Sequence, residues 1–300
     1  MSITTSSRSA SQVGEIRSGH CPLCGGDSRA KLKIDDMSIR GCDSCDHYFF
    51  LPSDRSKHIP NVYGDDYFYG GNAGYEDYEL EADLLVRSGK RYAKIVEPHG
   101  TTGCLLDIGA AAGYLLEGFQ SAGWKGIGVE PNHSMVQLGN QRGINIVHSA
   151  FEEFSCDRRF QMVTMIQVIA HILDPLQAIE KVRSLLAPHG LVLIETWDRR
   201  SWTARLFGKR WHEYSPPSVV QWFSRRGLDE MMSTSGFAKV KRGRPSKWIK
   251  LGHASSLIRY KMSNSRLGSI AAAPLALMPK HLKVPYFLDD VFWSLYQRQD

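Results

Sequence analysis

Short apolar runs alternate with amphipathic stretches through the middle of the chain. The apolar runs predict buried strands at CLLDIG (104–109), GIGVE (126–130), INIVHS (144–149), FQMVTMIQV (160–168) and GLVLIETW (190–197). The stretches between them have the apolar spacing of helices at 114–123, 134–143 and 175–188. This alternation predicts an α/β fold with a doubly wound, mostly parallel sheet that is covered on both faces.

Weaker patterns flank this block. They predict a helix at 79–97 that Pro98 ends, a helix at 219–236, and an antiparallel pair of strands at 237–243 and 289–299. Residues 250–285 show no clear period. We therefore expect five segments: a disordered lead (1–19), a small cysteine module (20–50), a connector with the first helix (51–98), the main domain (99–250) and a C-terminal extension with the last strand (251–300).

The charge of the chain is unevenly distributed. The net charge is +6, but residues 199–300 carry 19 Lys and Arg against 6 Asp and Glu, so this part alone has +13. A basic last third indicates an anionic partner, such as a nucleotide-sugar, an acidic carrier protein, a lipid surface or nucleic acid, or else a solvated basic face. The N-terminus is polar and serine-rich, and no apolar run reaches the ~18 residues of a transmembrane helix. We expect a cytoplasmic protein.

Four cysteines form two closely spaced pairs near the N-terminus. Cys21 and Cys24 make one CxxC pair, and Cys42 and Cys45 make the second after 17 intervening residues. This spacing is typical of a zinc ribbon, in which four thiolates hold one structural Zn²⁺ tetrahedrally. His47 follows the second pair and is expected to be a bystander. The module has five acidic residues against four basic ones, so nucleic-acid binding by it is not expected.

A glycine loop follows the first predicted strand of the main domain. Asp107 ends that strand, and Gly109, Ala111 and Gly113 then lead into the next helix. Glycine permits the tight turn and the close approach of a ligand. Glu130 ends the second strand, where a carboxylate can accept hydrogen bonds from both hydroxyls of an adenosine ribose. A dinucleotide site would use a third glycine for the pyrophosphate, whereas Asp107 suits a cofactor with a cationic amine.

At these residues the chain resembles the class I S-adenosylmethionine-dependent methyltransferases. LLDIGAAAGYLLEGFQSAGWKGIGVEPN is similar to the first motif of that family and its ribose acid, with Ala111 at the place of the usual middle glycine. CPLCGG and CDSCDHYFF before that motif resemble the bacterial methyltransferase-domain proteins that carry an N-terminal zinc ribbon. The resemblance implies a Rossmann-like sheet, S-adenosyl-L-methionine as cofactor and a structural Zn²⁺.

Further candidate site residues lie near the carboxyl ends of the strands, where ligands of parallel α/β sheets bind. Phe151 is expected beside the adenine, and Gln167 beside the cofactor. His171 is the first candidate for a general base, and Glu195 and Asp198 follow the fifth strand.

Two further segments could contribute to the site. Tyr67, Tyr69, Tyr75 and Tyr78 in the connector could wall it. GKRWHEYSPPSVVQWFS (208–224) resembles a substrate-side segment of the family, but Val219 stands where that family usually has histidine. This departure makes His212 a second candidate for the base beside His171, with transfer by proximity alone as the alternative.

The combined features predict methyl transfer to a small or carrier-linked metabolite. A sugar, a polysaccharide precursor or a secondary metabolite is expected, with O-methylation favoured and with an acceptor that could be anionic. One alternative is a non-catalytic partner that only binds the cofactor. A nucleic-acid methyltransferase is a second, less expected alternative, because MIQVIAH stands where such enzymes have an N/D-P-P-Y/F-like motif. No motif specifies an oligomeric state or the acceptor atom.

Overall fold

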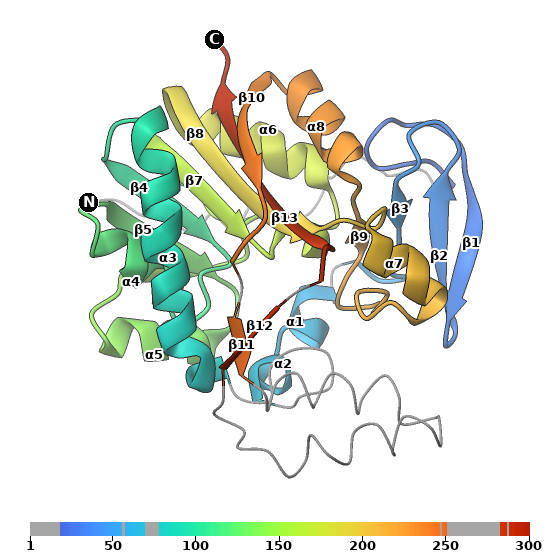
Figure 1. The fold of residues 1–300 in the computed structure, drawn as a ribbon, viewed down its shortest axis with the longest axis horizontal. Coiled ribbons are helices and arrows are strands. Elements are labelled where there is room, and N and C mark those ends of the chain that lie inside the picture. The colour runs from blue at the N-terminus through green and yellow to red at the C-terminus, as the bar shows by residue number, and fades with distance from the viewer. Residues whose placement is uncertain (1–18, 56–57, 70–77, 247, 251–282, 287) are drawn as a thin grey trace.

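The computed structural model describes residues 19–55, 58–69, 78–246, 248–250, 283–286 and 288–300 (Figure 1). The expected disordered lead and most of the unassigned stretch 250–285 lie outside these residues. A seven-stranded sheet forms the centre, in the order β10-β13-β8-β7-β4-β5-β6. Its strands are β4 (Cys104–Ile108), β5 (Lys125–Glu130), β6 (Ile146–His148), β7 (Phe160–Ile166), β8 (Leu186–Trp197), β10 (Phe237–Gly243) and β13 (Val291–Arg298).

The sheet is mostly parallel, as the alternating pattern predicts. β4 to β8 run parallel, and β13 lies antiparallel to both β8 and β10. The expected pair at 237–243 and 289–299 is therefore confirmed, and β13 lies inside the sheet rather than at its edge. The Rossmann-like, doubly wound α/β fold is also confirmed.

Helices cover both faces of the sheet. The longer ones are α3 (Ala82–Val96), α4 (Tyr114–Gln120), α5 (His133–Gln141), α6 (Pro175–Leu185) and α8 (Arg225–Thr234). One buried cluster joins α3 and α4 to the sheet through residues such as Tyr92 and Leu116, and another joins α6 and α8 through Ile179 and Leu228. A methyl group on Gly89 of α3 would lie 2.9 Å from the Cα of Gly118 in α4. Only glycine at these positions lets the two helices approach so closely.

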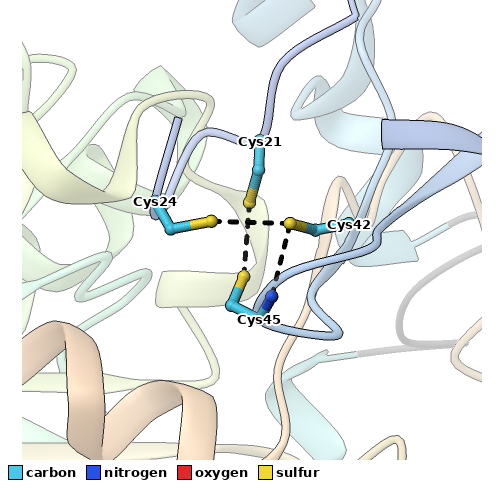
Figure 2. Close-up of side chains that lie close together, drawn as sticks. All are labelled: Cys21, Cys24, Cys42 and Cys45. Carbon is cyan, nitrogen blue, oxygen red and sulfur yellow. Dashed lines mark hydrogen bonds between the residues drawn. The ribbon is translucent and has the colours of Figure 1, made fainter. Parts of the chain in front are cut away.

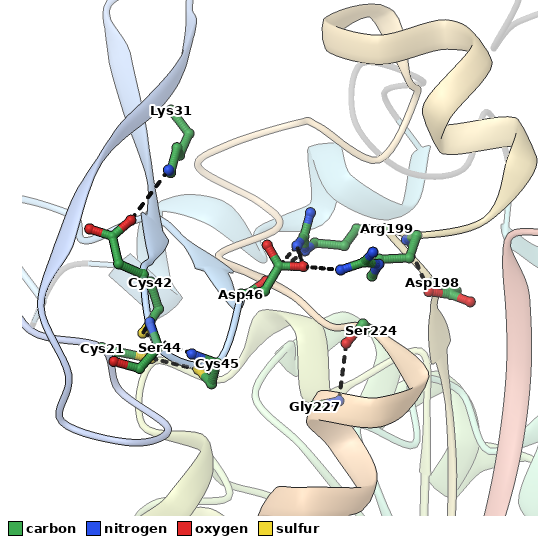
Figure 3. A network of polar contacts seen from close by, with 12 residues as sticks. Cys21, Lys31, Cys42, Ser44, Cys45, Asp46, Asp198, Arg199, Ser224 and Gly227 are labelled. Carbon is green, nitrogen blue, oxygen red and sulfur yellow. Dashed lines mark hydrogen bonds and ion pairs between the residues drawn. The ribbon is translucent and has the colours of Figure 1, made fainter.

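The predicted helix at 219–236 is wrong in its first third. Residues Gln221–Trp222 form a short strand, β9, and α8 begins only at Arg225. The Ser224 hydroxyl accepts a hydrogen bond from the Gly227 amide at 3.0 Å, which fixes the helix start (Figure 3). Pairing of β9 with a strand far away in the sequence overrides the local helical pattern.

The cysteine module forms a separate antiparallel sheet at one end of the molecule (Figure 1). Its strands are β1 (Ser28–Ile34), β2 (Met37–Cys42) and β3 (Tyr48–Phe49), and β9 of the main domain is its fourth strand. The shorter elements are α1 (His58–Val62), α2 (Asp65–Tyr69), α7 (Trp202–Phe207), β11 (Trp248–Lys250), β12 (Lys283–Pro285) and the 3₁₀ turns at Tyr78–Glu81, Glu97–His99, Ile169–His171 and Gly208–Arg210. Among the described residues, no helix is both long and apolar enough to cross a membrane.

Candidate functional site

The glycine loop connects β4 to α4 with three residues in the left-handed region. The φ angles are +69° at Gly109, +47° at Ala111 and +76° at Gly113. A side chain at Gly109 would place its Cβ 2.5 Å from a methyl carbon of Val168, so glycine is required there for space as well as conformation. Ala111 adopts this conformation despite its side chain, which costs on the order of 1 kcal/mol.

Glu130 holds the loop from the end of β5. Its side chain is buried, and its two oxygens accept hydrogen bonds from the amides of Ala111 and Asn132, each at 2.9 Å. A carboxylate has about four acceptor positions, so each oxygen can still accept one more hydrogen bond. Burial raises the pKa of Glu130 to about 7, although the two amides act in the opposite direction.

Asp107 lies near the end of β4, the strand next to β5, and is also buried. Its Oδ1 accepts a hydrogen bond from the Thr164 hydroxyl at 2.6 Å. Burial raises the pKa of Asp107 to about 7, and the nearby Glu130 adds to the shift. Two buried carboxyls with few polar partners favour a ligand that brings positive charge or hydroxyl donors.

These residues line one cavity of about 240 Å³ at the carboxyl ends of β4, β5, β7 and β8. Every predicted cofactor residue except Gly113 lines it: Asp107, Gly109, Ala111, Glu130, Phe151 and Gln167. Gly113 instead packs against Ile144 and Ile146 of the next βα unit. Tyr67 and Tyr78 line the cavity as expected, Tyr69 does not, and Tyr75 lies outside the described residues.

A buried hydrogen-bonded group forms another wall of the cavity. Glu195 of β8 accepts hydrogen bonds from the Gln167 side chain at 2.7 Å and from the Tyr92 hydroxyl. Gln167 has a φ of +62°, and its own amide donates to the Glu195 carbonyl at 2.9 Å. Tyr92 is a site residue that was not predicted. Its signal is helical spacing, because the cavity-lining residues of α3 follow one face at intervals of three and four: Leu84, Ser88, Arg91 and Tyr92.

The structure distinguishes the two candidate histidines. His171 lines the cavity, whereas His212 does not. His171 Nδ1 lies 2.7 Å from the Ser218 carbonyl, so Nδ1 must carry the proton and the neutral ring keeps Nε2 as its acceptor nitrogen. Burial lowers the pKa of His171 and favours the neutral form, although hydrogen bonds with the backbones of Ser218 and Gln167 act in the opposite direction.

His212 lies away from the cavity in a separate polar cluster. Its Nε2 is 3.3 Å from the Glu213 carboxylate and its ring meets that of Trp197 edge-on at 4.9 Å. Asp198 also lies outside the cavity and forms an ion pair with Arg225 at 2.9 Å. The base expected from His212 therefore has no support in the geometry.

The four ribbon cysteines point toward one another from two loops (Figure 2). Their Sγ atoms all lie within 4.8 Å of one another, with Cys21 and Cys45 3.5 Å apart and Cys24 and Cys42 3.4 Å apart. Sulfurs at about 2.3 Å from a tetrahedral Zn²⁺ are separated by about 3.8 Å, which is close to the separations in this cluster.

Hydrogen bonds from backbone amides also support the fit of Zn²⁺ to the four cysteines. The Sγ of Cys42 accepts from the amides of Ser44 and Cys45 at 3.3 and 3.4 Å, as a thiolate ligand would. The four cysteines could thus hold one Zn²⁺.

The ribbon is joined to the main domain by partly buried polar contacts. Arg199 donates two hydrogen bonds to the Asp46 carbonyl and pairs with its carboxylate (Figure 3). The Arg199 guanidinium also lies over the Tyr48 ring, 3.9 Å from its centroid. His47 is buried and contacts Gln221 of β9, so it is part of this joint and does not belong to the cysteine cluster.

A family model described as a methyltransferase domain matches residues 79–242, which is more than half of the chain. The protein belongs to this family. The chain therefore has a methyltransferase domain. Two solved structures share the fold of this chain, each with a TM-score of 0.51. The first is the YcgJ protein from Bacillus subtilis, which is 16% identical. The match covers 71% of this chain and 99% of that protein. The second is a provisionally assigned methyltransferase from Bacillus halodurans C-125, which is 12% identical. The match covers 70% of this chain and 99% of that protein.

Curated relatives of the methyltransferase are named ubiquinone biosynthesis O-methyltransferase. The relative from Bradyrhizobium diazoefficiens is 28% identical over 127 residues, which cover 40% of this chain and 48% of the relative. The relative from Alkalilimnicola ehrlichii is 22% identical over 187 residues, which cover 55% of this chain and 76% of the relative. The chain thus spans about half the length of the first of these relatives.

Proposed function

We propose that this methyltransferase transfers the methyl group of S-adenosyl-L-methionine to a hydroxyl of a small or carrier-linked metabolite. A sugar, a polysaccharide precursor or a secondary metabolite is the expected acceptor class. The observation that carries the proposal is that the buried Asp107 and Glu130 line the same cavity as His171. The names of the curated relatives favour oxygen as the acceptor atom.

The cofactor-binding roles follow from the chemistry of the residues present. Glu130 would accept the two ribose hydroxyls, and Asp107 would face the cationic methionyl amine. The small Gly109 and Ala111 would leave room for the ligand backbone, and Phe151 would flank the adenine. S-adenosyl-L-methionine supplies an already activated methyl group, so the protein must mainly align the acceptor and exclude water.

His171 would act as the general base. Its neutral ring keeps the acceptor nitrogen Nε2, while Nδ1 is held by the Ser218 carbonyl. A base is needed for a hydroxyl acceptor because the oxygen must lose a proton during methyl transfer. Tyr63 and Tyr67 meet the His171 ring edge-on, with centroid distances of 5.6 and 6.3 Å, and restrict where an acceptor can approach.

The ribbon would contribute a structural Zn²⁺ held by Cys21, Cys24, Cys42 and Cys45. A closed four-cysteine site leaves no open position for chemistry, so the ion would stabilise the module and its joint with the main domain. Reduced cysteines in this role fit the cytoplasmic localisation that the sequence predicts.

The test is transfer of a radiolabelled methyl group from S-adenosyl-L-methionine to fractionated small-molecule and carrier-linked extracts. Label in a metabolite fraction, lost in His171→Asn with cofactor affinity retained, supports the proposal. Cofactor binding without any transfer would make the protein a non-catalytic partner. Label found only in RNA or DNA would assign it to nucleic-acid methylation.

A further inference from the structure

A surface patch on and after α7 combines large apolar and basic side chains. We call it the α7 patch, and it consists of Trp202, Arg205, Leu206, Phe207, Lys209 and Arg210. The exposed fractions of its apolar side chains are 77% for Trp202, 80% for Leu206 and 52% for Phe207, and the six consecutive residues 205–210 are all exposed. Exposure of clustered apolar side chains to water costs free energy, so this cluster indicates a contact surface.

The rest of the fold holds α7 in this orientation. The Asp289 carboxylate accepts hydrogen bonds from the amides of Trp202 and Thr203, both at 2.9 Å, and from the Thr203 hydroxyl at 2.7 Å. The Ser201 hydroxyl caps the same turn by accepting from the Ala204 amide at 3.0 Å. Thr203 and Ala204 are buried, so the opposite side of the helix must face outward. The outward apolar side chains are therefore a fixed property of the fold.

The basic residues of the α7 patch are available for an anionic partner. Within the part of the chain that the structure describes, no ion pair joins Arg205, Lys209 or Arg210 to a carboxylate. The Arg205 guanidinium lies 5.7 Å from the centroid of the Trp202 ring, so charge and apolar surface are directly adjacent. The patch also lies in the basic last third of the chain, which has 19 Lys and Arg against 6 Asp and Glu.

We propose that the α7 patch docks the protein onto an anionic membrane surface. Trp202, Leu206 and Phe207 would enter the headgroup region, and the three basic side chains would bind lipid phosphates around them. This proposal is independent of the proposed function, because the patch residues do not line the cavity.

Each of two other partners would match only the apolar or only the basic side chains of the α7 patch. A second copy of the chain would cover the apolar side chains but would bring the positive charges of Arg205, Lys209 and Arg210 toward the same charges on its partner. Nucleic acid would neutralise the charges but would leave Trp202 and Leu206 in water. An anionic lipid surface accommodates both kinds of side chain at once.

The experiment is co-flotation of the full-length protein with vesicles of phosphatidylcholine alone or with phosphatidylglycerol replacing about a third of it. We expect binding at least about tenfold tighter to the anionic vesicles, falling with added salt. Trp202→Ser/Leu206→Ser should lower the binding, and Arg205→Glu/Lys209→Glu/Arg210→Glu should abolish it. Circular dichroism and cofactor titration check that each variant is folded.

Matched controls lie elsewhere on the surface. Leu80→Ser removes another exposed leucine, and Lys90→Glu/Lys94→Glu reverses two exposed charges on α3, so both variants should bind vesicles like the parent protein. Equal binding to both kinds of vesicle, or full binding by the Arg205→Glu/Lys209→Glu/Arg210→Glu variant, would overturn the proposal. Self-association that Trp202→Ser/Leu206→Ser removes, without vesicle binding, would overturn it in favour of a second copy. RNA or DNA retention that depends on the patch, without vesicle binding, would overturn it in favour of nucleic acid.

Discussion

His47 of the ribbon and Gln221 of β9 are both buried, and the histidine Nε2 lies 2.8 Å from the glutamine Oε1. The amide nitrogen of the same Gln221 side chain donates to the carbonyls of Ile172 and Leu173 at 3.1 and 3.3 Å. Those two residues directly follow His171 in the chain. One glutamine therefore links the cysteine module to the segment that carries the proposed base.

Gln221→Leu should disturb His171 without unfolding the protein. The substitution keeps the size of the side chain but leaves buried carbonyls without donors, so the His171 segment should loosen. Burial lowers the pKa of His171, and water entering beside it should bring that pKa back toward 6.5. NMR titration of labelled histidine, with His171→Asn for assignment, measures the change.

The control for this variant is Gln120→Leu, because the Gln120 side chain also bonds to a carbonyl, that of Gly126, away from the cavity. It should leave the titration of His171 unchanged. An unaltered titration in the Gln221 variant would mean that the ribbon does not influence the base.

Metal analysis should find about one zinc ion per chain. Cys24→Ser should lower the zinc content and the melting temperature, because the closed site contributes binding free energy to folding. Cys156→Ser removes a cysteine outside the cluster and should change neither quantity. Absence of bound metal in protein purified without chelator would remove the zinc assignment.

Glu130→Gln should weaken cofactor binding by about 1–3 kcal/mol, because a charged acceptor is lost from the ribose position. Isothermal titration with S-adenosyl-L-methionine measures this loss. Glu117→Gln is the matched control, since Glu117 lies on α4 outside the cavity and pairs with Arg142. Equal affinity in both variants would mean that the ribose binds elsewhere.

Cofactor affinity should rise with pH through the neutral range. Asp107 and Glu130 have pKa values raised to about 7, mainly by burial, and both must be ionised to bind hydroxyls and a cationic amine. Titrations between about pH 6 and pH 8 should show the rise, and Asp107→Asn or Glu130→Gln should flatten it.

Rising pH should lower the stability of the ligand-free protein through the same two carboxyls, Asp107 and Glu130. In the unfolded chain these carboxyls lose their protons near pH 4, whereas the folded protein keeps them up to about pH 7. Unfolding in this range therefore releases protons. The contribution of the two carboxyls to the free energy of unfolding should fall as pH rises from about 4 to about 7. Urea unfolding of the ligand-free protein and of Glu130→Gln measures the difference in slope. Equal slopes would contradict the raised pKa.

Ala111→Gly should be tolerated better than Ala112→Gly. Ala111 has a φ of +47°, so glycine relieves backbone strain there and offsets the greater entropy of the unfolded chain. Ala112 is fully buried without a positive φ, so its glycine variant only loses packing and gains unfolded-state entropy. The difference in unfolding free energy should be about 1 kcal/mol, measured by urea denaturation. Equal losses would show that the loop is unstrained at Ala111.

The sequence predicted the features that depend on local pattern. The period of the apolar runs indicates the parallel strands, and the glycine loop and the acid at Glu130 stand at fixed intervals from them. Their physical basis is short-range, because a strand end and the following turn specify where Asp107 and Gly109 lie. The CxxC spacing is likewise local, since each pair occupies one tight loop.

The features that were missed depend on contacts between distant segments. β9 forms because Gln221 and Trp222 pair with β3, about 170 residues earlier in the chain, and no local pattern encodes that pairing. Tyr92 likewise donates a hydrogen bond to Glu195, which lies 103 residues later in the chain. His212 lies within the family-like segment 208–224, yet it packs against Trp197 and does not line the cavity. Sequence spacing alone could not separate it from His171.

The place of β13 in the sheet has a consequence for synthesis. β8 and β10 are both translated well before residues 291–298, yet β13 lies between them and pairs with each. Until the ribosome has released residue 298, β8 keeps an unpaired edge that other chains could join. The methyltransferase sheet therefore closes only after translation of this segment, and a nascent chain stalled before it should aggregate or recruit chaperones.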